Sequence, residues 1–454
     1  MNNSAAILVI TPDTIGDRMA GPAIRAWEIA RTLSNVGIVR LVSTVGATIT
    51  HPDFDVVHAQ KDSLRPHAAW ADIIIVQGHI LRSHPWLKSC EAIIVADIYD
   101  PLHLEQLEQG KDFPEADRYA IALDSIEVMN DQMERADFML CASEKQRDFW
   151  LGQLAGLARI NPATYDQDPS LRSLLAVAPF GIQEIPPVQT SHGIRGVVDG
   201  IGFDDRVILW GGGIYNWFDP ITLIQAIARI AETRPNVRLF FLGVKHPNPD
   251  VPQMEMERKA REISDRLGLT NRFVFFNETW VAYESRANFL LDADVGVSTH
   301  LDHVETAYSF RTRILDYIWA SLPIIATSGD TFAPIIEDNG LGITVPAGDI
   351  DALVEAIEDL LFDDERRALT SERVRQHAAK LVWSLMLRPL VEFCEHPLRA
   401  ADHTRGVISQ RNQIVADLRK RIIGIESSSS WRLTALLRVA GTNFKKLRTR
   451  RQRK

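Results

Sequence analysis

The sequence predicts an α/β chain with two doubly wound, parallel-sheet (Rossmann-like) domains that face each other across a cleft, followed by a basic helical C-terminal tail. Three observations support this fold class. Apolar runs of strand length alternate with segments of helical periodicity, the alternation occurs in two series, and a proline-rich stretch separates the series. Fully apolar runs are typical of strands in a parallel sheet that helices cover on both faces.

The first series contains five strand candidates, and helical patterns such as residues 23–35 follow them. These candidates are residues 5–13, 38–44, 72–78, 92–100 and 136–143. The stretch that follows, residues 159–203, has lower regularity and contains several prolines, so we interpret it as a linker.

The second series begins at Arg206 and contains six strand candidates, at residues 206–212, 237–243, 272–278, 293–299, 322–329 and 342–348. Helical patterns then continue to about residue 395. We therefore expect an N-terminal domain at residues 1–185, a C-terminal domain at 186–398 whose last helix returns to the N-terminal domain, and a separate segment at 399–454.

The last segment differs in composition from the body. From Arg405, apolar residues recur in sevens over fewer than three heptads, which is compatible with a short coiled coil, a homodimer or a segment that folds back. Residues 427–454 carry nine Lys/Arg and no acid, and their apolar residues fall on one helical face. Such a helix suits an anionic membrane surface, and the alternatives are a solvated tail or packing on a neighbouring subunit.

The net charge of −9 is unevenly placed, because residues 1–426 carry 41 basic and 59 acidic side chains. An acidic body argues against a nucleic-acid partner. Cys90, Cys141 and Cys394 lack metal-ligand spacing and indicate reduced thiols in a cytoplasmic protein. The first apolar run reads as a strand rather than a signal peptide, and no run approaches the ~20 apolar residues that cross a bilayer.

Glycine-rich turns follow the first strand of each series. Gly16 and Gly21 bracket the first turn, which leads into a helix and presents backbone amides suited to phosphate or hydroxyl groups. Its spacing is not GxGxxG, and a plain strand-to-helix turn is the alternative. The second turn contains Gly212 and Gly213 within three consecutive glycines, which allow a ligand to approach the backbone closely.

A third motif begins at Glu305. If a helix starts near Ser309, its free amides meet Arg311 and Arg313 at a positive terminus, which suits a diphosphate. Asp316 lies two turns further on a similar face, where its carboxylate can accept hydrogen bonds from ribose hydroxyls. A surface helix with ion-paired arginines is the alternative.

Together these features resemble the retaining glycosyltransferases of family four, which have the GT-B fold. The resemblance covers about residues 6–397 and is most specific over 294–349. It rests on the two-domain rhythm, the first glycine turn, ADFMLCASEKQRDFW, VAPFGI, SFRTRILDYIWASLPIIATSGD and APIIEDNGLGITVPAGD. It implies a nucleotide-sugar donor held mainly by the C-terminal domain, an acceptor held mainly by the N-terminal domain, and neither a metal nor another cofactor.

The family's signature is a pair of glutamates separated by seven residues. Asp316 matches the second position, so the resemblance gives it the ribose-binding role. Tyr308 stands at the first position, and Glu305 lies three residues earlier. Residues 214–220 also lack the family's basic pair, which leaves the diphosphate to Arg311 and Arg313. Ser309 and Phe310 complete the donor-binding candidates of this motif.

On the acceptor side, the family's histidine has no match, because Asp97, Tyr99 and Asp100 follow the corresponding strand. Paired carboxylates invite a general acid/base interpretation, and the alternatives are hydrogen bonds to acceptor hydroxyls or a capping role. His79, one strand earlier, either lines the cleft or is structural. Trp280 either flanks the nucleobase or packs in the core. The catalytic candidates are Arg311, Glu305 and Asp97, and the acceptor-side candidates are Gly16, Gly21, His79 and Asp100.

The resemblance therefore implies a retaining, metal-independent glycosyltransferase that moves a sugar from a nucleotide-sugar to a glycan or lipid-linked acceptor. The tail SSSSWRLTALLR also resembles segments of bacterial surface-polysaccharide glycosyltransferases, which implies a role in cell-envelope polysaccharide synthesis. We expect it in the cytoplasm, with the tail as a contact to the inner face of the membrane. The alternatives are a nucleotide-sugar 2-epimerase, or a scaffold protein that keeps the fold without turnover because the first glutamate is missing.

Overall fold

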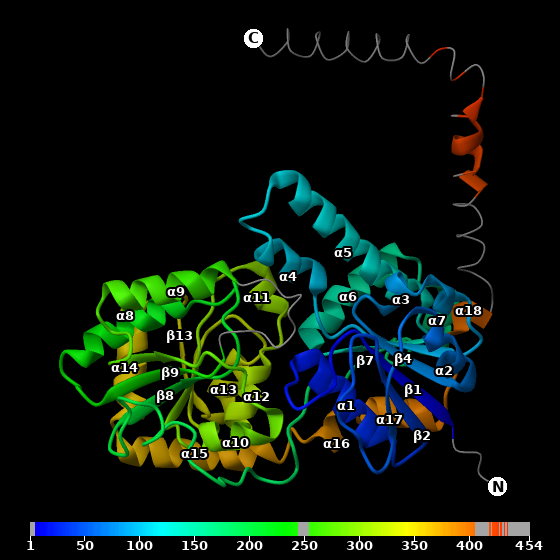
Figure 1. Cartoon of the computed structure of the whole chain (residues 1–454). Coiled ribbons are helices and arrows are strands. Elements are labelled where there is room, and N and C mark those ends of the chain that lie inside the picture. Colours follow the sequence, from blue (N-terminus) through cyan, green and yellow to red (C-terminus); the bar gives the residue numbers. More distant parts are fainter. Residues whose placement is uncertain are drawn as a thin grey trace.

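The computed structural model describes residues 5–243, 254–404 and the short pieces 417–418, 420–425, 427–428, 431 and 434. Two lobes lie side by side, and the chain ends of the described body lie on the N-terminal lobe (Figure 1). The predicted heptad segment and basic tail fall largely outside the described residues.

The N-terminal lobe is built on a seven-stranded parallel sheet in the order β3-β2-β1-β4-β5-β6-β7. The five predicted strands are confirmed as β1, β2, β4, β5 and β6. Two strands were not predicted, because one is a four-residue edge strand with an exposed start and the other is a three-residue strand inside the expected linker. The strands are β1 (Ala6–Thr11), β2 (Ile38–Ser43), β3 (Asp55–His58), β4 (Ile73–Gln77), β5 (Ile93–Asp97), β6 (Phe138–Cys141) and β7 (Leu175–Val177).

Helices cover both faces of this sheet, and the α4–α5 hairpin projects from the top of the lobe (Figure 1). The expected linker also contains a short helix, α7, which makes the prediction of an irregular stretch partly wrong. The helices are α1 (Gly21–Leu33), η1 (Lys61–Leu64), α2 (Arg65–Trp70), α3 (Ile80–Ser83), η2 (Pro85–Ser89), α4 (Leu102–Gln109), α5 (Glu115–Arg135), α6 (Glu144–Gly156) and α7 (Pro162–Gln167).

The C-terminal lobe contains a six-stranded parallel sheet in the order β10-β9-β8-β11-β12-β13, and all six predicted strands are confirmed. They are β8 (Arg206–Trp210), β9 (Val237–Phe241), β10 (Val274–Phe276), β11 (Val295–Ser298), β12 (Ile324–Thr327) and β13 (Gly342–Val345). The predicted boundary at residues 185–186 lies between the last strand of the first sheet and the first strand of the second.

Some helices of this lobe begin at a side-chain cap. Asp219 accepts a hydrogen bond from the Thr222 N–H at the start of α8, and Asp349 accepts one from the Ala352 N–H at the start of α14. The helices are α8 (Pro220–Ala231), α9 (Glu255–Arg266), η3 (Tyr283–Ser285), α10 (Arg286–Leu290), α11 (Val304–Tyr308), α12 (Thr312–Trp319), α13 (Ala333–Asn339), α14 (Ile350–Leu361) and α15 (Asp364–Ala378).

After α15 the chain crosses back to the N-terminal lobe. Ile182 and Val382 pair in a short parallel bridge, and α16 (Trp383–Met386) and α17 (Arg388–Glu395) contact α1, beside which they lie in Figure 1. The following helix, α18 (Ala401–Thr404), is anchored by an ion pair between Arg159 and Asp402, both side chains being fully buried.

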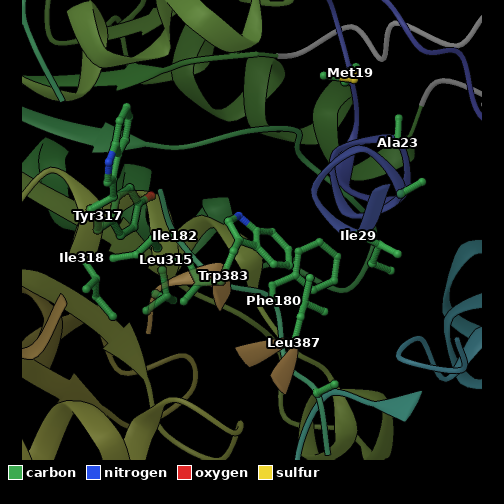
Figure 2. Packing of buried hydrophobic residues seen from close by; sticks show 14 of the residues in the cluster. Met19, Ala23, Ile29, Phe180, Ile182, Leu315, Tyr317, Ile318, Trp383 and Leu387 are labelled. Atoms are coloured by element: carbon green, nitrogen blue, oxygen red, sulfur yellow. The ribbon is translucent and has the colours of Figure 1, made fainter. Parts of the chain in front are cut away.

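One apolar cluster runs from the N-terminal sheet through this crossing to α12 of the other lobe. Figure 2 shows Phe180 and Trp383, whose ring centroids are 5.7 Å apart, between Ala23 and Ile29 of α1 and Leu315 of α12. The two lobes therefore share buried apolar surface at the base of the cleft, which fixes the helices that line it.

Candidate active site

Two adjoining cavities lie where the carboxyl ends of the two sheets face each other. One, here named the Asp316 cavity, spans about 840 Å³ of space that is partly open to solvent, and it is lined by the Gly211–Gly213 turn and by α12. The other, the Asp100 cavity, spans about 1050 Å³ and is also partly open to solvent; it is lined by the start of α4 and by residues 309–313. Both are lined by Ala20, Gly21, Phe180, Tyr215, Thr312 and Arg313.

The glycine turn after β8 forms one wall of the Asp316 cavity. Gly212 has a φ of +79°, and a Cβ built there would meet no atom within 4 Å, so this residue presents an open backbone edge. The hydroxyl of Tyr317 accepts a hydrogen bond from the Gly211 N–H at 2.7 Å, while burial raises the pKa of this phenol to about 12. Tyr317 thereby ties the glycine turn to α12.

Arg313 stands at the junction of the two cavities. Its Nη2 donates to the carbonyl oxygen of Gly213 at 2.7 Å, and its guanidinium lies 3.9 Å from the centroid of the Phe218 ring. The side chain is 7% exposed, and Nη1 has no hydrogen-bond partner among the described residues. Burial lowers the pKa of Arg313 to about 10, which still leaves the group charged at neutral pH.

Asp316 presents a half-exposed carboxylate to its cavity, with 42% of the side chain accessible. Arg286 donates to its Oδ1 at 3.2 Å and lies 3.7 Å from the ring centroid of Tyr283 and 4.3 Å from that of Trp319. No sequence motif marked Arg286. Its role becomes visible only when the loop after β10 is placed beside α12.

The third sequence motif folds differently from the expectation. The helix does not begin near Ser309, because α11 ends at Tyr308 and α12 begins at Thr312. Between them, Arg311 makes two hydrogen bonds with Glu305, Nη1–Oε1 at 3.0 Å and Nη2–Oε2 at 2.7 Å. The two side chains are 5% and 1% exposed, so the charge of this arginine is compensated within the protein.

A pair of carboxyl groups forms the N-terminal wall of the Asp100 cavity. Asp100 follows β5, Glu105 lies in the first turn of α4, and their side chains hydrogen-bond each other. Burial raises the pKa of Asp100 to about 6, and Glu305 acts in the same direction. Burial also raises the pKa of Glu105 well above its usual value. Glu105 is a second residue that no sequence motif indicated.

Asp97 does not line either cavity. Its carboxylate accepts hydrogen bonds from Arg25 Nε at 2.6 Å, Arg25 Nη2 at 2.8 Å and Gln77 Nε2 at 3.1 Å, and the Arg25 and Asp97 side chains are fully buried. The Arg25 guanidinium also lies about 5 Å from the ring centroids of Tyr99 and Phe180. Asp97 therefore holds cavity-lining rings in place rather than facing a ligand.

The remaining sequence candidates divide between the cleft and the outside. Gly21 lines both cavities, Trp280 lines the Asp316 cavity, and Ser309 and Phe310 line the Asp100 cavity. Gly16 and His79 line neither cavity.

Several contacts join the lobes across the cleft, and two of them involve the loop after β10. Trp280 Nε1 donates to the carbonyl oxygen of Met19 at 3.4 Å, and the Tyr283 N–H donates to that of Asp17 at 3.0 Å.

Two kinds of feature are absent from the described residues. Among residues 5–243, 254–404 and the short later pieces, no group of three His, Cys, Asp or Glu side chains is placed to hold a metal. In the same part of the chain, no helix has the length and apolar character needed to cross a bilayer.

Residues 205–363 match the protein family described as glycosyl transferases group 1. One relative, a D-inositol 3-phosphate glycosyltransferase of Corynebacterium urealyticum, is 25% identical over 42% of this chain and 43% of its own length. A second, a phosphatidyl-myo-inositol mannosyltransferase of Mycolicibacterium smegmatis, is 21% identical over 44% and 47%. The chain thus spans less than half the length of these relatives.

Solved structures match over most of the chain. HepE of Anabaena, in a complex with UDP and glucose, matches 87% of this chain and 100% of its own with a TM-score of 0.61 at 14% identity. The sucrose-phosphate synthase of Thermosynechococcus elongatus matches 92% and 100%, with a TM-score of 0.59 at 14% identity. The fold is GT-B. The family match also contains every donor-side residue that the sequence indicated, from Gly212 to Asp316.

Proposed function

We propose that this protein is a glycosyltransferase that moves a sugar from a nucleotide-sugar donor to a glycan or lipid-linked acceptor, with retention of anomeric configuration and without a metal. The observation that carries the proposal is Arg313, a buried cation at the junction of the two cavities with an unpartnered Nη1. A diphosphate at this junction would place the reacting bond between a donor site and an acceptor site.

The electrostatics of the junction suit the departure of a nucleoside diphosphate. The N-terminus of α12 opens at Thr312, which lines both cavities, and its first amides have no partner inside the helix. Together with Arg313 they stabilise the negative charge that gathers on the leaving oxygens in the transition state. Arg311 contributes less, because Glu305 already neutralises it.

The Asp316 cavity supplies the contacts that a nucleoside needs. Arg286 occupies Oδ1 of Asp316 and leaves Oδ2 to accept hydrogen bonds from ribose hydroxyls. The indole of Trp280 and the phenol ring of Tyr283 line the same cavity and offer flat faces for a nucleobase. The open backbone at Gly212 and Gly213 gives the diphosphate room to approach the turn.

The cellular role in the proposal is cell-envelope polysaccharide assembly at the cytoplasmic face of the membrane. It is supported by a structural neighbour, WaaG, described as a glycosyltransferase involved in lipopolysaccharide biosynthesis, which matches 87% of this chain with a TM-score of 0.55 at 17% identity. The basic tail at residues 427–454 is the proposed membrane contact. Equal flotation with anionic liposomes of the full chain and a chain ending at residue 426 would refute this role of the tail.

The test of the donor site is a calorimetric titration of the full chain with UDP, GDP, ADP and their sugar conjugates, with and without Mg²⁺. We expect one nucleotide to bind without metal. We expect Arg313→Ala to weaken the affinity for this nucleotide about 100-fold, because hydrogen bonds to charged groups contribute about 1.5–3 kcal/mol. Arg388→Ala is the matched control, because this arginine is 71% exposed and lines neither cavity. NMR of the product then gives its anomeric configuration.

A catalytically inactive scaffold is the second candidate, and one observation favours it. Tyr308, at the position of the family's first glutamate, stacks on Phe149 with ring centroids 4.5 Å apart and lines neither cavity. A folded protein that binds no nucleotide in the titration would select this candidate. Donor consumption that yields only an epimerised nucleotide-sugar would select the epimerase instead.

A further inference from the structure

We propose that Asp100 and Glu105 are the acceptor-recognition pair of the cleft, and that they select an uncharged, hydroxyl-bearing sugar or polyol over a phosphorylated one. The proposal rests on the proposed function, because it names the acceptor class of the same site. Four features of the Asp100 cavity lead to it: two carboxyl groups without an ion-pair partner among the described residues, an arginine neutralised by Glu305, a lining of aromatic rings, and the buried Arg313, which the proposed function assigns to the donor.

The two carboxyl groups are available to a ligand. They hydrogen-bond each other, and neither forms an ion pair with any side chain in the described part of the chain. The nearby cation, Arg311, is held by Glu305 through two hydrogen bonds and is 5% exposed. A pair of carboxyl groups offers several acceptor oxygens and, when it shares a proton, one donor, which matches the hydroxyl groups of a polyol.

The rest of the lining suits the carbon face of a sugar. Tyr215 and Trp217 stack with ring centroids 4.9 Å apart and planes 4° apart, and both line this cavity. A mostly apolar wall with a few converging polar groups is the usual construction of a small-molecule site. The aromatic side chains that line it are Tyr99, Phe180, Tyr215, Trp217, Phe218 and Phe310.

A second, independent observation marks the boundary between the donor site and the acceptor site. Arg313 lines this cavity, is 7% exposed and has an unpartnered Nη1, so a buried cation that can bind an anion lies where the two cavities adjoin. When the donor diphosphate pairs with Arg313, the Asp100–Glu105 pair is left at the acceptor side, and with one shared proton it keeps one negative charge. A phosphorylated acceptor would then meet this charge and the charges of the donor's phosphates, and such like-charge contacts disfavour binding.

The proposal is tested on the full chain saturated with the nucleoside diphosphate that binds most tightly. Ligand-observed NMR and calorimetry would compare matched probes: myo-inositol with D-inositol 3-phosphate, and methyl hexopyranosides with their 6-phosphates. We expect each neutral probe that binds to do so at least about 10-fold more tightly than its phosphate. The double variant Asp100→Asn/Glu105→Gln should bind the neutral probes about 10-fold more weakly. It should also show a smaller ratio between the affinities for neutral and for phosphorylated probes.

Asp112→Asn is the matched control, because it makes the same chemical change at an exposed position of the loop between α4 and α5. Three results would overturn the proposal: tighter binding of the phosphorylated probes, unchanged neutral-sugar binding in the double variant, or no binding of any neutral probe to a protein that still binds nucleotide. If the unmodified chain bound no nucleotide, the proposed function itself would be overturned, so the two failures are distinguishable. If the double variant does not fold, the same comparison of probes is made with the single variant Glu105→Gln.

Discussion

Replacing Asp97 by asparagine separates a positioning role of this residue from a chemical one. The carboxylate accepts three hydrogen bonds, two from Arg25 and one from Gln77, and the arginine and aspartate side chains are 0% exposed. Asparagine has nearly the same shape, but it removes the negative charge and turns an NH₂ group towards one of these donors. The variant therefore leaves a buried, uncompensated guanidinium, which is the costly outcome for a buried pair.

The expected loss of stability follows from that burial. Breaking a buried ion pair by removing one partner costs about 3–5 kcal/mol. For a lobe of about 200 residues, each kcal/mol lowers the melting temperature by about 2–4 °C, so we expect a fall of about 10 °C in the transition of the N-terminal lobe. Calorimetric melting and urea denaturation of Asp97→Asn, with Asp112→Asn as the control, would measure it.

The double variant Arg25→Met/Asp97→Leu completes the test. It removes both charges, so we expect it to recover part of the stability that the single variant loses. An Asp97→Asn protein that melts like the unmodified chain while losing all transfer activity would refute this reasoning. Such a result would indicate that Asp97 takes part in the chemical step.

Three further predictions concern the cleft and its support. Gly296→Ala should destabilise the C-terminal lobe by about 1–3 kcal/mol, because a Cβ there would lie 2.4 Å from the Tyr317 ring; urea denaturation measures it, and an unchanged midpoint would contradict it. Arg286→Leu should weaken nucleotide binding about 10-fold in calorimetry, because it removes the partner that orients the Asp316 carboxylate, whereas equal affinity would dismiss that role. Burial raises the pKa of Asp100 to about 6, so the folded protein favours the protonated carboxyl. The contribution of this group to the stability of the fold is therefore fully present below about pH 4 and is lost as the pH rises through 6. The free energy of unfolding of Asp100→Asn, measured by melting, should therefore exceed that of the unmodified chain by at most about 3 kcal/mol at pH 8 and should equal it at pH 4. A difference that does not change with pH would contradict this prediction.

The sheets could be predicted from the sequence because their strands are apolar on both faces. β4 and β8 stand out as runs such as IIIVQ and RVILW, whereas β7 has three residues and lies within a proline-rich stretch. The start of α12 was misplaced by three residues. A continuous polar and aromatic run gave no sign that Arg311 would turn back to pair with Glu305 between two helices.

The site could be predicted only where one segment carries it. Gly212, Arg313 and Asp316 follow directly from local patterns after strands, and the structure brings them to one cavity. Arg286 and Glu105 were missed because their partners lie on other elements: Arg286 on α10 meets Asp316 on α12, and Glu105 on α4 meets Asp100 after β5. Such pairings depend on tertiary contacts that periodicity and spacing do not encode.

The two arginines of the third motif show how neighbouring residues of one type acquire different roles. Arg311 lies before the first turn of α12 and is neutralised by Glu305, so its charge stabilises the loop that shapes the Asp100 cavity. Arg313 lies within that turn, where its one described hydrogen bond goes to a backbone carbonyl and its guanidinium packs on Phe218. A carbonyl does not cancel a full positive charge, and burial makes that charge costly until an anion arrives. In the proposed function, Arg313 is therefore the arginine that binds the diphosphate, and it would take the part of the basic pair that the family carries after the first C-terminal strand.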